Sequence, residues 1–148
     1  MEAWITDEPL RPDDVLARVG ATGDGAVLLF LGTVRDENEG RRVSGMRYDA
    51  YRAMAERVLS EIVAEAAARV GPARIAAAHR IGELAVGDVS VAVAISTPHR
   101  VHAYDGSRYI IEEIKKRLPV WKQERYVSGE ADWLGGAIPP LTEQAVRE

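Results

Sequence analysis

Residues 89–96 place the strongest constraint on the fold, because branched and small side chains alternate there without interruption. The residues Val89, Val91, Val93 and Ile95 are separated by Ser90, Ala92, Ala94 and Ser96. This is the two-residue period of a β-strand, whose successive side chains point to opposite faces. The pattern predicts a pleated strand with branched residues on one face and small residues on the other.

Strand and helix patterns alternate along the remainder of the chain. Strands are expected at residues 3–6, 26–31, 43–51, 74–81 and 121–127, and helices at residues 12–19, 53–70 and 98–118. The strand at 26–31 is apolar on both faces, which predicts burial, and Met46 and Tyr48 share one face of the strand at 43–51. A polar loop is expected at 36–42 and a connector at 82–87. The arrangement predicts one mixed α/β (α+β) domain.

The composition is that of an ordinary globular protein and excludes several functions. Of the 148 residues, 47% are hydrophobic and 28% charged, and the net charge of −4 opposes general nucleic-acid binding. Without cysteine, the chain has no disulfide, thiolate nucleophile or cysteine-ligated metal. The first ten residues are acidic where a targeting signal is basic, and no apolar run has the length of a membrane span. We therefore expect a cytoplasmic protein.

A His-Arg pair at the start of the helix expected at 98–118 suits an anionic ligand. Thr97 is predicted to be the N-cap and Pro98 the first helical residue, so His99 and Arg100 fall in the first turn. Free backbone N–H groups and the helix dipole attract anions there, and an Arg fork with an imidazole would hold a phosphate or carboxylate. The alternative is that His99 covers a sheet edge and Arg100 forms a surface ion pair.

Two lysines near the end of the same helix form a second group. Lys115 and Lys122 are seven positions apart, and Pro119 interrupts the helix between them. We expect the interruption to fold Lys122 back towards Lys115 over the Trp121 ring. Two ammonium groups in a partly dry pocket would lower each other's pKa and make a lysine a proton donor or nucleophile near neutral pH. Equally, cations are simply favoured at a helix C-terminus.

The sequence gives weaker indications of other ligand-binding, metal-binding or nucleophilic residues. Arg35 follows a strand end, where charged residues face either a ligand crevice or solvent. His99 and His102 are three positions apart but lack an acidic partner, so no metal site is predicted. The glycine-containing segment at 32–42 lacks the Gly-Lys-Ser/Thr sequence that ends a phosphate-binding P-loop. The chain also lacks the Gly-x-Ser-x-Gly motif that carries the nucleophile of many serine hydrolases. Possible nucleophiles are therefore lysine, serine, threonine and the carboxylates, and no cofactor is predicted.

Three segments follow one another in the chain, namely FLGTVRDENEGRRVSGMRYDAYRAMAE, HRIGELAVGDVSVAVAISTPHRVHAY and IIEEIKKRLPVWKQE. In this order they resemble the large, catalytic subunit of molybdopterin synthase, and the resemblance covers residues 25–133. It implies an α/β hammerhead fold with an additional antiparallel β subdomain. The domain is expected to span residues 1–134, followed by a tail at 135–148 that is mobile or docked on a partner.

The resemblance also implies an activity and partners. Enzymes of this family convert cyclic pyranopterin monophosphate into molybdopterin by inserting two sulfurs that form a dithiolene. The sulfur arrives as a thiocarboxylate on the C-terminal Gly-Gly of a small ubiquitin-like subunit, whose tail enters a pocket of the large subunit. Two large and two small subunits form a heterotetramer around a homodimer of the large one. The chain is thus expected to be a sulfurtransferase without a cofactor.

The motif positions imply the site residues. Lys115 and Lys122 match the family's pocket lysines and are expected to be catalytic. Lys115 would act at the thiocarboxylate–substrate junction, and Lys122 would stabilise the charge that develops during the reaction. The residues expected to bind substrate are Thr33, Val34, Arg35, His99, Arg100, Gln123 and Glu124, and those expected in the pocket wall are Phe30 and Ile111. Glu124 would orient Lys122. His99 and Arg100 are expected to serve the pocket of the neighbouring large subunit.

One departure and two alternative functions accompany this interpretation. Some members carry a further pocket arginine after the tryptophan that matches Trp133, but here the next basic residue is Arg147, so no site is assigned to the tail. Lys116 and Arg117 are expected to be solvated surface. A basic pocket also fits another phosphate-ester or nucleotide-binding enzyme. A dimeric scaffold for a ubiquitin-like partner is the second alternative, although a scaffold has no need of two closely placed lysines.

Overall fold

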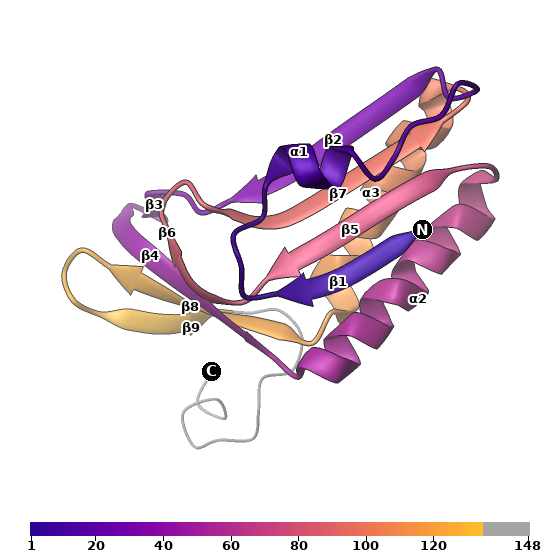
Figure 1. Cartoon of the computed structure of the whole chain (residues 1–148). Helices are drawn as coiled ribbons and strands as arrows, with labels where there is room; N and C mark the ends of the chain where they lie inside the picture. Colours follow the sequence, from indigo (N-terminus) through magenta and orange to yellow (C-terminus); the bar gives the residue numbers. More distant parts are fainter. Residues whose placement is uncertain (135–148) are drawn as a thin grey trace.

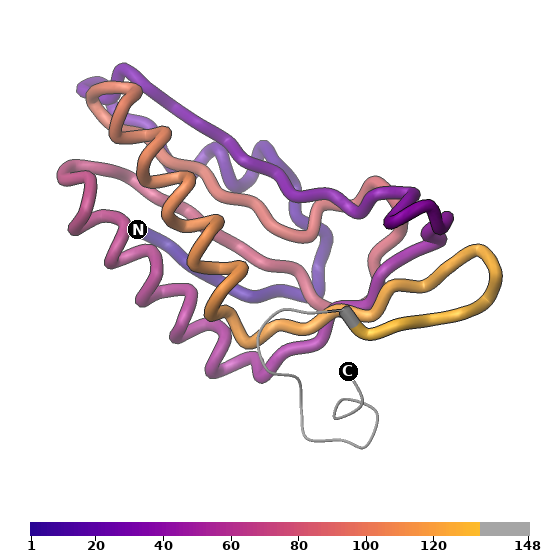
Figure 2. Tube along the Cα trace, turned by 180° about the vertical axis from the view of Figure 1, so that it is seen from behind, coloured from indigo at the N-terminus to yellow at the C-terminus, as the bar shows by residue number. Residues whose placement is uncertain are grey.

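The computed structural model describes residues 1–134, in which one mixed sheet is covered by helices. The sheet has the order β1-β5-β7-β2, formed by β1 (Glu2–Thr6), β5 (Arg74–Arg80), β7 (Val89–Thr97) and β2 (Ala26–Thr33). β1 and β5 are parallel, and the other neighbours are antiparallel. The helices α2 (Arg52–Val70) and α3 (Arg100–Arg117) lie side by side over one face, and α1 (Pro12–Leu16) covers the other (Figure 1, Figure 2).

A second, antiparallel sheet is built around β4 (Arg41–Ala50). β8 (Val120–Tyr126) pairs along one edge of β4, and β9 (Ala131–Leu134) pairs with β8. β6 (Gly82–Ala85) and β3 (Glu37–Asn38) pair with the other edge. This sheet projects from one end of the four-stranded sheet (Figure 1). The prediction of a mixed α/β fold with an additional antiparallel subdomain is confirmed.

The alternation along β7 separates two hydrophobic cores. Val91, Val93 and Ile95 face α2 and α3 in the larger core. Ala92 and Ala94 face the opposite side, where they pack in a smaller core under α1. Since all five side chains are buried, β7 is the central strand around which both layers assemble. Its small residues allow the short α1 to approach the sheet closely.

Helix boundaries agree with the sequence pattern at most ends. α2 starts one residue before the expected position and ends at Val70, after which Gly71 adopts a positive φ of 83°. α1 starts at Pro12 but ends at Leu16, earlier than residue 19, because the next amides of Arg18 and Val19 bond to carbonyls three residues back. Among the described residues, no helix has the length and apolar character needed to cross a membrane.

β2 is not the buried strand that its apolar pattern predicted. It forms an edge of the four-stranded sheet, with β7 as its neighbour on one side. Consequently Val27 remains 49% exposed and Phe30 38% exposed. Apolar residues on both faces of a strand indicate burial only when the strand has cover on both sides, and an edge position removes part of that cover.

The polar loop expected at residues 36–42 is a β-hairpin instead. β3 and β4 are joined by Glu39 and Gly40, whose φ angles are 51° and 80°. Two consecutive positive φ angles are typical of the type I′ turn, which matches the twist of paired strands. Glutamate rarely adopts such a conformation, so the local residues do not indicate this turn.

Two further short strands were not predicted. The connector expected at residues 82–87 contains β6, where the buried Leu84 packs against Val34 and Met46. The apolar residues of β6, Leu84 and Ala85, are adjacent and therefore give no recognisable period. β9 was also missed, and it extends the second sheet through its pairing with β8. The tail expected at residues 135–148 lies outside the described residues.

Gly25 makes a close backbone contact that joins the start of β2 to the start of α3. Its N–H donates to the Pro98 carbonyl at 3.2 Å, and a Cβ at this position would lie 2.8 Å from that oxygen. Because a backbone atom cannot rotate away, Gly25→Ala should lower the free energy of unfolding by about 1–3 kcal/mol. Gly23→Ala is the control, since its Cβ would meet no atom of residues 1–134 within 4 Å. Urea denaturation measures both variants, and equal stability would contradict the prediction.

Candidate functional site

α3 and β8 bring Lys115 and Lys122 to the same hollow. Both side chains line a hollow of about 80 Å³ and an adjoining one of about 280 Å³. α3 ends because Pro119 has no N–H to donate and holds Leu118 in an extended conformation, with φ −67° and ψ 123°. β8 begins at Val120. The two lysines therefore meet around Pro119, although Lys122 lies on a strand and not on a continued helix.

The Trp121 ring does not lie between the lysines, so that part of the prediction is wrong. Neighbouring residues on a strand point to opposite faces, and Trp121 therefore leaves β8 on the side away from Lys122. It is buried and packs edge-on against Tyr51, with ring centroids 5.4 Å apart. Trp121 anchors β8 to the start of α2, and it lines neither of the two hollows.

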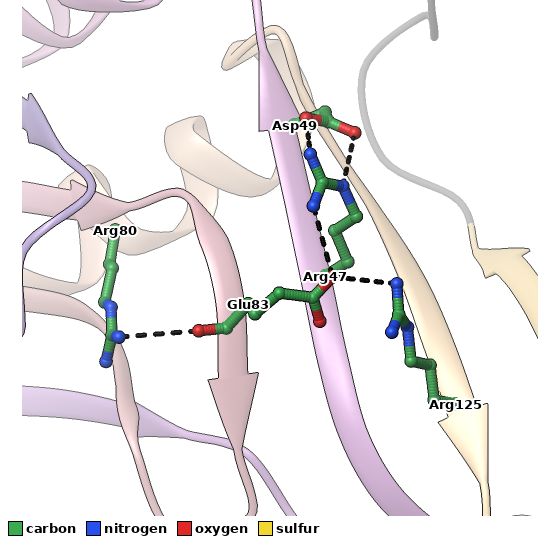
Figure 3. Close-up of polar contacts among 5 residues, drawn as sticks. All are labelled: Arg47, Asp49, Arg80, Glu83 and Arg125. Carbon is green, nitrogen blue, oxygen red and sulfur yellow. Dashed lines mark hydrogen bonds and ion pairs between the residues drawn. The ribbon is translucent and has the colours of Figure 1, made fainter.

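The outer face of β4 and β8 carries a cluster of charged residues (Figure 3). Arg47 bonds to Asp49 at 3.2 Å and to Glu83 at 3.1 Å, and Arg125 bonds to Glu83 at 2.8 Å. Gln123 lies opposite Arg47 in the strand register, and directly opposed residues share a face. The structure therefore places Gln123 with this outer cluster and does not bring it to the hollows with the other residues expected to bind substrate.

Most of the other expected site residues border the two hollows. They are Phe30, Thr33, Val34, Arg35, Ile111 and Glu124, in addition to the two lysines. Arg35 and Thr33 are exposed at the rim, whereas Val34 is buried. Sequence reasoning missed Tyr48, His79 and Ser90, which line the smaller hollow. These three lie on different strands, so no spacing within the sequence connects them.

His99 and Arg100 lie at the opposite end of α3 from Lys115. The helix begins at Arg100 with His99 as its N-cap residue, so the prediction of Thr97 as N-cap and Pro98 as first helical residue is wrong. The Thr97 hydroxyl instead donates to the His99 carbonyl at 2.6 Å. Arg100 and Lys115 are separated by about 22 Å along the helix axis, at a rise of ~1.5 Å per residue. Within one chain, the exposed His-Arg pair is therefore remote from the lysines.

Glu124 is a buried carboxylate held by two donors. It is 4% exposed and accepts hydrogen bonds from Asn38 Nδ2 at 3.0 Å and from the Tyr126 hydroxyl at 2.7 Å. Arg35 donates to Asn38 Oδ1 at 3.4 Å, and the Arg41 guanidinium lies 3.5 Å from the centre of the Tyr126 ring. The β3–β4 hairpin therefore reaches across the sheet to fix Glu124. Sequence reasoning missed Asn38 and Tyr126 because it did not predict the hairpin.

The surroundings of Lys122 favour its neutral form. Burial lowers the pKa of this lysine below its ordinary value, and the positive charge of Lys115 lowers it further. Glu124 opposes these effects and Arg35 adds a smaller lowering effect. A lysine with a lowered pKa has a larger neutral fraction near pH 7, so it can accept a proton as well as donate one.

His79 is a buried imidazole beside both lysines. Its Nδ1 lies 2.8 Å from the Arg80 carbonyl oxygen, and its ring meets the Tyr48 ring edge-on with centroids 5.0 Å apart. Since a carbonyl oxygen only accepts, this contact assigns the ring proton to Nδ1. The pKa of His79 is lowered to about 4, mainly by burial and also by the positive charges of Lys115 and Lys122. The hydrogen bond with the Arg80 carbonyl acts in the opposite direction and raises it.

Arg117 is not the solvated residue that its position at the helix end predicted. Its guanidinium bonds to Glu65 on α2 at 2.7 Å and to Glu113 on α3 at 2.9 Å. The hydrogen bond from Arg117, with that from Tyr109, lowers the pKa of Glu65 to about 2. This group joins the two helices outside the site. Lys116, by contrast, is 69% exposed, as expected.

Removing one donor from Glu124 should destabilise the fold. Tyr126→Phe leaves a buried carboxylate with one fewer hydrogen bond, so the free energy of unfolding at pH 7 should fall by about 1–3 kcal/mol. Tyr109→Phe is the matched control, because the Tyr109 hydroxyl donates at 2.6 Å to Glu65, whose side chain is 40% exposed. Its loss should be smaller, since water can replace the bond. Urea titrations compare the variants, and equal losses would show that the burial of Glu124 has no energetic consequence.

The pKa of His79 predicts a specific dependence of stability on pH. Because the pKa falls from 6.5 to about 4 on folding, the folded state binds fewer protons than the unfolded state between these values. The part of the unfolding free energy that depends on neutral His79 is complete above pH 6.5. It decreases as the pH falls towards 4, by up to about 3 kcal/mol. His79→Asn cannot ionise and should lack this part of the decrease. Unfolding free energies of both proteins from pH 7.5 to 4 test this, and parallel curves would contradict it.

Comparisons with known proteins identify the family. Residues 5–117 match the model of the MoaE protein family. "Molybdopterin synthase catalytic subunit 1" of Mycobacterium tuberculosis is 41% identical over 131 residues, which cover 88% of each chain. "Molybdopterin synthase catalytic subunit" of Halalkalibacterium halodurans is 43% identical over 134 residues, 90% of this chain and 85% of that one.

Solved structures agree with the sequence relatives. A molybdopterin synthase crystal structure from Staphylococcus aureus has a chain 34% identical, which aligns with a TM-score of 0.85 over 89% of this chain and 96% of that one. A chain from the complex of subunits 1 and 2 of the Helicobacter pylori molybdopterin-converting factor, 22% identical, shares the fold with a TM-score of 0.74 over 94% of each chain. This chain therefore belongs to the MoaE family, the catalytic subunits of molybdopterin synthase.

Proposed function

We propose that this chain acts in the cytoplasm as a sulfurtransferase that converts cyclic pyranopterin monophosphate into molybdopterin. In this reaction two sulfurs, delivered as thiocarboxylates on a small ubiquitin-like subunit, form the dithiolene. The observation that carries the proposal is the convergence of Lys115 and Lys122 from α3 and β8 on one hollow. A thiocarboxylate and a phosphate ester are both anionic at neutral pH, and a basic pocket suits both.

The two lysines have different surroundings, which supports different roles. Lys115 is exposed at the end of α3 and can reach a group that enters from outside. We assign it to the thiocarboxylate–substrate junction, where an ammonium polarises the acyl group or moves a proton as sulfur attacks. Lys122 is half-buried with a lowered pKa. It would stabilise the charge that develops, while the clamped Glu124 on the same strand face orients it.

Arg35 and the pocket wall would bind the substrate. The Arg35 guanidinium lies at the rim of the larger hollow, where it can form charge-assisted hydrogen bonds to a phosphate. Thr33 and Val34 border the same hollow beside it, and Phe30 and Ile111 contribute apolar wall. We leave Gln123 outside this set because it lies on the outer face of β8.

A second copy of the chain would complete the site. His99 and Arg100 lie about 22 Å from Lys115 along α3, at ~1.5 Å per residue, so they cannot contact the substrate in the pocket of their own chain. Both are exposed at the start of α3, where an anion is favoured. We propose that they bind the substrate in the pocket of a neighbouring copy, within a heterotetramer of two large and two small subunits.

Reconstitution tests this function. The full chain is mixed with the thiocarboxylated small subunit and cyclic pyranopterin monophosphate, and dithiolene product is measured. Wild type should form product, Lys115→Ala should lose at least about 100-fold in rate, and Lys122→Ala should also lose activity. Lys116→Ala is the matched control on the exposed side of α3 and should retain the wild-type rate.

The same assay separates the alternatives. An enzyme for other phosphate esters or nucleotides would act without the small subunit. A scaffold would bind the small subunit but form no product. Absence of product from wild type, or a Lys115→Ala rate equal to that of wild type, would contradict the proposed function.

A further inference from the structure

His79 occupies the smaller hollow but has no part in the roles assigned so far. The polar side chains of that hollow come from four strands and one helix, namely Tyr48 of β4, His79 of β5, Ser90 of β7, Lys115 of α3 and Lys122 of β8. The hollow therefore gathers two ammonium donors, two hydroxyls and one imidazole. The imidazole differs from the others because one of its nitrogens is a pure acceptor.

The His79 ring is held in one orientation. Its Nδ1–H donates to the Arg80 carbonyl at 2.8 Å, and the Tyr48 ring packs edge-on against it. A flipped ring would place a C–H group against that carbonyl oxygen and remove this part-buried hydrogen bond, which is costly. Nε2 consequently carries the lone pair. Within residues 1–134 no side chain or backbone group hydrogen bonds to it, and the ring retains 6% exposure at the hollow.

The donors that line the hollow with this lone pair are the Tyr48 and Ser90 hydroxyls and the two lysine ammonium groups. The Ser90 hydroxyl donates to the Gly32 carbonyl at 3.2 Å, so its proton is already used. Both lysines line this hollow together with His79. Lys115 is the more exposed of the two and extends from the end of α3, so its ammonium group has the greater freedom to turn towards the ring. An ammonium group has three N–H donors. One can bond to His79 while the other two remain for the reacting acyl group.

Lys115 also needs such a partner more than Lys122 does. Its side chain is exposed, whereas that of Lys122 is half-buried, and no ion pair of residues 1–134 includes Lys115. A catalytic group acts efficiently only when it is held in the reacting geometry, and an error of 1 Å can cost about 100-fold in rate. Because burial keeps His79 neutral at pH 7, its Nε2 remains an acceptor throughout the range in which the enzyme would work.

We propose that His79 is a positioning residue whose Nε2 accepts a hydrogen bond from the Lys115 ammonium and directs it to the reacting acyl group. This inference rests on the proposed sulfur transfer, since it assigns a task to Lys115. It differs from a purely structural role, in which the ring would only fill space beside Tyr48 and bond to Arg80.

Two substitutions distinguish the roles of the two ring nitrogens of His79. In His79→Asn, the side-chain amide can keep the bond to the Arg80 carbonyl but has nothing at the Nε2 position. In His79→Gln, the longer amide places a carbonyl oxygen near that position and can accept in its place. In the reconstituted assay, His79→Asn should lower kcat by about 10- to 100-fold with KM within about threefold. His79→Gln should restore kcat to within about threefold of wild type.

An NMR measurement tests the same inference without an activity assay. In the full chain labelled with ¹⁵N-histidine, the NMR spectrum at pH 6 to 8 should show His79 as a neutral ring protonated on Nδ1. A proton on Nε2, wild-type kcat in His79→Asn, or equal losses in the Asn and Gln variants would overturn the inference. Failure of wild type to form product would instead overturn the proposed function. In that case the protonation state seen by NMR still decides whether His79 offers a fixed acceptor.

Discussion

The turn at Leu118 and Pro119 is the constraint on which the site depends. Proline has no N–H to donate and restricts the residue before it to extended conformations, so α3 must end at this point. The chain then enters β8 directly. As a result, Lys115 on the last turn of the helix and Lys122 on the strand face one hollow although they belong to different elements. A longer connection would leave their relative position to loop flexibility.

The register between β4 and β8 then decides what surrounds the lysines. Lys122 pairs with Tyr48 and Glu124 pairs with Met46, so these four side chains share the inner face. Burial and the charge of Lys115 destabilise the ammonium of Lys122, whereas Glu124 stabilises it. Because Glu124 is buried and fixed by two hydrogen bonds, the balance is set by geometry and not by a mobile ion pair. A shift of register by one residue would exchange this face for the outer cluster of Figure 3.

The sequence predicted the parts of the fold that have a strong local period. β7, α2 and β4 appear within a few residues of the expected bounds, because each carries several side chains that repeat at the spacing of its own element. The hairpin at Glu39 and Gly40 and the short β6 were missed because they form through pairing with β4 and not through a period of their own. The exposure of β2 depends on its place at the sheet edge, which no local pattern contains.

The site residues also divide into those that a local sequence motif indicates and those that only contacts between distant elements reveal. Lys115, Lys122 and Arg35 were found because they stand in recognisable motifs, and the structure brings them to adjoining hollows. Gln123 was grouped with its neighbours in sequence, but alternation along β8 sends it to the opposite face. Asn38, Tyr126 and His79 were missed because their importance lies in contacts between distant elements. Their partners become visible only when β3, β5 and β8 are placed relative to one another.

α3 carries positive side chains at both of its ends, and its length prevents them from acting together in one chain. A straight helix holds its termini apart as a rigid spacer, at ~1.5 Å per residue. The start of α3 favours an anion through its free N–H groups, while its end presents Lys115 to the hollow. If both ends bind the same anionic substrate, as we propose, two copies of α3 must contribute opposite ends to each site. The rigidity of this helix would then make dimerisation a requirement of catalysis, because no rearrangement within a single chain could bring the two groups together without unfolding α3.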